Sequence, residues 1–68
     1  MVDPVVSLRA ECDRLSRRLE DGDRRIAKAE RAGQDVAAWE SFWIELLQEY
    51  EGVYRMLVAS LHEQMKSA

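Results

Sequence analysis

Residues 39–57, WESFWIELLQEYEGVYRML, decide the fold of this chain. The stretch holds both tryptophans, both tyrosines and the single phenylalanine of the sequence. Its apolar residues recur every three or four positions, which is the spacing of a helix that packs along a seam. A neighbouring row of apolar residues widens this face well beyond the ~100° stripe that an ordinary surface helix buries. We therefore expect this helix to be the centre of an assembly.

The pattern predicts a helix over residues 36–65, interrupted on its polar side by Gly52. Its seam starts at Val36, and Met56 and Met65 extend the two flanks of the apolar face. A single neighbouring helix cannot cover a face of this width. The residues predicted to form the core and the interface are Trp39, Phe42, Trp43, Ile44, Leu46, Leu47, Tyr50, Val53, Tyr54, Leu57, Val58 and Leu61.

A second amphipathic pattern predicts a helix over residues 4–31. Asp3 can cap its start, and Pro4 suits the first helical position because the N–H that proline lacks has no partner there. Small residues replace leucine in the second half of the seam, nearest the next helix. The predicted seam consists of Val5, Leu8, Cys12, Leu15, Leu19, Gly22, Ile26 and Ala29.

Residues 32–35 are predicted to form a tight turn. Gly33 can adopt the left-handed conformation that ends a helix, and Asp35 can cap the next one. So short a turn makes the two helices antiparallel neighbours, which brings Gly22 and Ala29 level with the tryptophans. The sequence thus predicts one all-α domain over residues 1–68, an antiparallel two-helix hairpin.

The size of the chain predicts self-association. Chains below ~70–80 residues rarely form a sufficient core without disulfides, a metal or a partner. One cysteine excludes an internal disulfide, and one cysteine with one histidine does not supply the four ligands of a structural zinc site. We expect two hairpins to pair into a four-helix bundle.

The net charge of −3 is unevenly distributed. Residues 1–33 carry eight basic and seven acidic side chains, whereas residues 34–68 carry two basic and six acidic ones. We expect acids placed four residues before arginines to form local ion pairs, at Asp13–Arg17, Glu20–Arg24 and Asp21–Arg25. Because acids interrupt the basic stripe, we do not expect it to bind nucleic acid. That stripe consists of Arg14, Arg17, Arg18, Arg24, Arg25, Lys28 and Arg31.

The chain offers few residues for chemistry. Cys12 occupies a seam position and is expected to act as a small apolar residue, and His62 is expected on the surface. Glu45 and Glu49 are helical neighbours but Glu51 points elsewhere, so we expect an acidic surface and no metal site. The sequence has no phosphate-binding loop, nucleophile motif or zinc signature. We expect no enzyme activity, no cofactor and no metal.

The sequence therefore predicts a small structural or interaction protein that self-associates through its aromatic-rich helix, in the role of an adaptor, small chaperone or regulatory subunit. A first alternative is an obligate subunit whose hairpin is completed by a helix of a different protein. A weaker alternative is a nucleic-acid-associated protein that uses the arginine stripe. No membrane span or signal-peptide pattern is present, which predicts a cytoplasmic protein that does not bind membranes.

Overall fold

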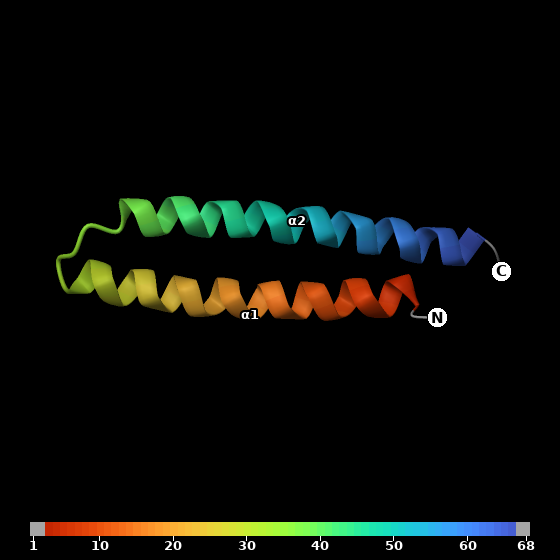
Figure 1. Cartoon of the computed structure of the whole chain (residues 1–68), viewed down its shortest axis with the longest axis horizontal. Coiled ribbons are helices and arrows are strands. Elements are labelled where there is room, and N and C mark those ends of the chain that lie inside the picture. Colours follow the sequence, from red (N-terminus) through yellow and green to blue (C-terminus); the bar gives the residue numbers. More distant parts are fainter. Residues whose placement is uncertain (1–2, 67–68) are drawn as a thin grey trace.

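The computed structural model describes residues 3–66, which form two helices, α1 (Pro4–Arg31) and α2 (Ala37–Lys66). Positions 1, 2, 67 and 68 of the predicted domain lie outside the described residues. The helices run antiparallel, side by side, with the turn at one end and the start of α1 and the end of α2 at the other (Figure 1). The predicted all-α hairpin is confirmed, and its overall extents are 55 × 16 × 16 Å.

The start of α1 is fixed by a side-chain cap. The carboxylate Oδ1 of Asp3 accepts a hydrogen bond from the backbone N–H of Val5 at 2.9 Å, and Pro4 takes the first helical position. This bond satisfies one of the N–H groups that have no partner within the helix. At the open end of the hairpin, Gln64 also donates a hydrogen bond to Asp3 Oδ1, at 3.5 Å, which links the start of α1 to the end of α2.

The turn closes α1 with a pair of backbone hydrogen bonds around Gly33. The Gly33 N–H donates to Glu30 O and the Gln34 N–H donates to Ala29 O, both at 3.0 Å. This is the Schellman arrangement, which needs a residue with positive φ, and Gly33 has φ 77°. The left-handed glycine predicted from the sequence is confirmed.

The turn is one residue longer than predicted, because α2 begins at Ala37 and ends at Lys66. Asp35 Oδ1 accepts a hydrogen bond from the Ala37 N–H at 3.0 Å, which confirms Asp35 as a cap. Val36 lies before the helix, and its carbonyl accepts the first helical bond, from the Glu40 N–H at 2.8 Å. Its side chain is nevertheless buried, so the apolar pattern continues through a residue that is not helical.

The core is a thin layer between the two helices. One cluster gathers around Val5, Cys12 and Leu57 near the open end. The other gathers around Leu15, Leu19 and Leu46 in the middle of the rod, where Leu15 is the only fully buried large side chain among the described residues. Every seam position predicted on α1 is buried or half-buried, because α1 has one apolar stripe and α2 covers it.

Candidate interaction surface

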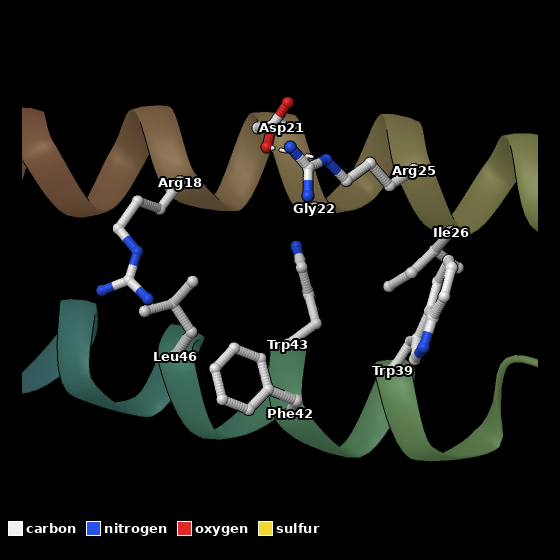
Figure 2. A pocket seen from close by; sticks show the side chains of 9 residues that line it. All are labelled: Arg18, Asp21, Gly22, Arg25, Ile26, Trp39, Phe42, Trp43 and Leu46. Carbon is white, nitrogen blue, oxygen red and sulfur yellow. Dashed lines mark ion pairs between the residues drawn. The ribbon is translucent and has the colours of Figure 1, made fainter.

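Trp43 is held in place by both helices. Its indole N–H donates a hydrogen bond to the backbone carbonyl of Leu19 at 2.8 Å. The ring edge lies against Gly22, where an added Cβ would be 2.9 Å from Trp43 Cδ1. Figure 2 shows the indole standing between the helices and pointing at Gly22. The predicted match of a small residue with a tryptophan is therefore present for this pair.

Trp39 is placed differently from what the seam pattern predicts. It occupies a seam position, yet 49% of it is exposed. The turn is one residue longer than predicted, and at this end of the hairpin Val36, which is 7% exposed, is the buried member of the apolar pattern. Figure 2 shows the Trp39 indole beside Ile26, at the edge of the contact between the helices. Trp39 thus contributes more to the surface than to the core.

Alongside the residues that face α1, α2 carries a further apolar stripe, which we call the second apolar row. Its positions recur every three or four residues, which is the heptad spacing. Glu51 occupies the one position of this row that is not apolar. Leu47 and Leu61 pack against the core clusters, while the outer members are about half exposed or more. The second apolar row consists of Ile44, Leu47, Tyr54, Val58, Leu61 and Met65.

The ring of Tyr54 is stacked on that of Tyr50. The ring centroids are 6.1 Å apart with an interplanar angle of 25°. Tyr50 packs against both core clusters, whereas Tyr54 is 51% exposed. The pair therefore connects the core to the middle of the second apolar row and limits the rotamers open to Tyr54.

Acidic side chains of α1 border one end of the second apolar row. A shallow groove beside Ile44 is lined by three acids, Asp23 and Glu30 of α1 and Glu40 of α2, and otherwise by apolar side chains. Since α1 presents charged side chains on this side of the hairpin, the exposed apolar surface here belongs almost entirely to α2. Val6 of α1 is also apolar and exposed. It was not predicted as an interface residue, because it falls outside the seam of α1.

The opposite side of the hairpin carries a different groove, which we call the aromatic groove. Phe42 and Ile44 are two residues apart on the helix, so they lie on nearly opposite sides of α2. The aromatic groove has a volume of about 300 Å³ and lies between the helices near the turn (Figure 2). It is lined by Arg18, Asp21, Gly22, Arg25, Ile26, Trp39, Phe42, Trp43 and Leu46.

The exposed surface of the hairpin is large for its size. The accessible surface is 5588 Å², whereas a folded monomer of this mass has about 4,400 Å². The excess of roughly 1,200 Å² exceeds the ~800 Å² that each partner buries in a standard protein–protein interface. A rod of two helices has this excess because each helix has only one neighbour.

Two ion pairs lie on α1. Arg25 pairs with Asp21 at 3.1 Å, as predicted, and Arg14 pairs with Glu11 one turn before it. The hydrogen bonds from Arg14 hold the pKa of Glu11 below its ordinary value. The other two predicted pairs, Asp13–Arg17 and Glu20–Arg24, are not formed within residues 3–66. Long exposed side chains gain little by pairing, so their spacing alone does not ensure a contact.

The side chains considered as catalytic residues or metal ligands do not form one site. Cys12 is a buried free thiol in the core near Leu57, and His62 is on the surface. Glu45, Glu49 and Glu51 are all exposed. Within the described range 3–66, no three histidine, cysteine or acidic side chains come together as metal ligands do. Neither helix of that range has an apolar stretch long enough to cross a bilayer.

Comparison of the chain with protein-family models, with curated proteins and with solved structures finds no match.

Proposed function

We propose that the chain is a non-enzymatic interaction protein that self-associates through the second apolar row of α2. The observation that carries the proposal is the exposure of this row in the isolated hairpin: Ile44 is 50% exposed, Val58 48% and Met65 77%. Soluble monomers rarely leave so continuous an apolar stripe in water. In this role the protein acts as an adaptor, small chaperone or regulatory subunit, and it works without a cofactor.

In the proposed assembly, the α2 helices of two copies meet and the α1 helices lie outside them. This order follows from the distribution of apolar surface, since α1 buries its one stripe against α2 and borders the second apolar row with Asp23 and Glu30. Four helices result, as in the bundle predicted from the sequence, but the contact between copies is made mainly by the two α2 helices.

Glu51 favours an antiparallel contact. In a parallel pair, Glu51 would lie against the Glu51 of the other copy, and two carboxylates in an apolar seam repel each other. In an antiparallel pair centred near Tyr54, Ile44 meets Met65 and the two Glu51 side chains are about 10 Å apart along the axis. Each Glu51 then comes within one helical turn of an Arg55, which can pair with it across the interface.

Burial of the second apolar row is the driving force of the proposed contact. Burying the exposed half of Ile44 or of Val58 contributes about 1 kcal/mol per side chain, and both copies contribute each of them. Met65, Tyr54 and Leu61 add to this sum. Micromolar association requires about 8 kcal/mol after the costs of ordering are met, so loss of two members of the row should dissociate the assembly.

The test is the mass of the protein in solution by light scattering across a range of concentrations. We expect a dimer or higher oligomer for the parent and a monomer for Ile44→Glu/Val58→Glu. The matched control is Ala38→Glu/Ala59→Glu, which adds two acids to exposed positions on another side of α2 and should leave the mass unchanged. A parent that is a folded monomer by circular dichroism would refute self-association and favour the alternative in which a different protein completes the hairpin.

A further inference from the structure

The aromatic groove lies on the side of α2 that the proposed self-association leaves open. Its floor is formed by Trp39, Phe42, Trp43, Ile26 and Leu46. Phe42 is 61% exposed, and no part of the second apolar row lines the groove. A binding event here is therefore separate from the contact between copies.

The groove is formed before any partner binds. The Trp43 indole is fixed by its 2.8 Å hydrogen bond to the Leu19 carbonyl and by its contact with Gly22. Because Gly22 has no side chain, the indole can enter between the helices and leave a hollow beside Phe42 (Figure 2). A fixed apolar floor lowers the entropy that binding must overcome.

The rim of the groove is basic, although the chain as a whole is acidic. Arg18 and Arg25 both line it from α1, and Asp21 is its single acid. Arg25 forms an ion pair with Asp21 at 3.1 Å. Arg18 forms no ion pair with another described residue, and its side chain extends across the opening of the groove toward Leu46 (Figure 2). The groove on the other side of the hairpin is lined by three acids and no cation.

We propose that the aromatic groove binds an amphipathic helix of a different protein, one that carries acids seven residues apart with apolar residues between them. Arg18 and Arg25 are seven residues apart on α1, about 10.5 Å along the axis, so a partner helix lying along the groove would present acids to both at the same spacing. The apolar side chains between those acids enter the floor beside Phe42 and Trp39.

A second copy of the chain does not fit this description. None of the acids of α2 are seven residues apart. On α1, Asp13 and Glu20 have this spacing, but the residues three and four after Asp13 are serine and arginine. Asp23 and Glu30 also have it, but Ile26 between them is half-buried and lines the groove of its own hairpin. The occupant is therefore a helix from another protein.

The probe for this site is a synthetic helical peptide with glutamates at positions i and i+7 and leucines at i+3 and i+4. Both tryptophans of the chain line the groove, so their fluorescence reports occupancy directly. We expect a saturable blue shift with this peptide and about tenfold weaker binding when both glutamates are replaced by glutamine. Arg18→Glu should weaken binding at least as much, while Arg24→Glu, an arginine outside the groove, should leave it nearly unchanged.

The proposal is overturned by no saturable change in fluorescence, by equal binding of the glutamine peptide, or by equal loss with Arg24→Glu and Arg18→Glu. The test is also independent of self-association. Ile44→Glu/Val58→Glu should retain peptide binding where circular dichroism shows it folded. Loss of binding in that folded variant would place the peptide on the surface between copies and not in the aromatic groove.

Discussion

Gly22 and Trp43 are in such close contact that the position of the indole depends on the absence of a side chain at residue 22. The contact brings the ring nitrogen to the Leu19 carbonyl at 2.8 Å and shapes the floor of the aromatic groove. The absence of a side chain at residue 22 thus determines both the packing of the hairpin here and the shape of the candidate binding surface.

Gly22→Ala should destabilise the hairpin by about 1–2 kcal/mol and red-shift the tryptophan emission. Alanine favours a helix by up to ~1 kcal/mol over glycine, but its Cβ would lie 2.9 Å from the indole, which must move and lose its hydrogen bond. Urea unfolding followed by circular dichroism and fluorescence measures both effects.

Gly52→Ala is the matched control, with the opposite sign. A Cβ at residue 52 meets nothing within 4 Å, so the variant should gain about 0.5–1 kcal/mol and keep the parent emission. Destabilisation of both variants alike would mean that the contact between Gly22 and Trp43 is not what determines the effect.

Gly33→Ala should destabilise the hairpin by about 1–2 kcal/mol. Residue 33 has φ 77° with open space around it, so the cost arises from the backbone of an L-residue in the left-handed region and not from a clash. Thermal unfolding measures the change. The neighbouring Gln34→Ala keeps the backbone bond to the Ala29 carbonyl and should be nearly neutral.

Glu51→Leu should tighten self-association about tenfold or more, because it replaces the one charged residue of the second apolar row with an apolar one. It should also weaken the preference for antiparallel pairing. Sedimentation equilibrium measures the first effect, and energy transfer between dyes attached near the turn of each copy measures the second. Weaker association of this variant would show that Glu51 is not in the interface.

The basic stripe of α1 should not bind nucleic acid measurably at about 0.15 M salt. Asp21 interrupts the stripe and pairs with Arg25, and the net charge of the chain is −3. Fluorescence anisotropy with labelled duplex and single-stranded oligonucleotides tests this. Micromolar binding that falls steeply with salt would favour the nucleic-acid alternative, and Arg17→Glu/Arg24→Glu should then abolish it.

The pair of Glu11 with Arg14 should give α1 a small stability that depends on acid pH. The hydrogen bonds from Arg14 lower the pKa of Glu11 in the folded state, so the contribution is complete above the ordinary glutamate pKa and is lost as pH falls through the lowered one. Circular dichroism melts between about pH 7 and pH 2 should show a smaller acid loss for Glu11→Gln than for the parent. An identical profile for both proteins would mean that the pair contributes nothing to stability.

The sequence by itself determined the helical hairpin. Heptad spacing marked both helices, Asp3 and Asp35 marked their starts, and Gly33 marked the turn, because each of these signals acts over a few neighbouring residues. The second apolar row was also predictable from the sequence, because residue spacing alone shows that the apolar face of this helix is too wide for one neighbouring helix to cover.

The tertiary structure decided what depends on how far one helix slides and turns against the other. Val36 is buried outside the helix and Trp39 is half exposed, although both continue the same apolar pattern. The aromatic groove, with Arg18 at its rim, exists because the indole of Trp43 meets Gly22 across 20 intervening residues of sequence. Periodicity assigns a residue to a face, but packing between rigid side chains sets which residues on that face touch and which remain open to a partner.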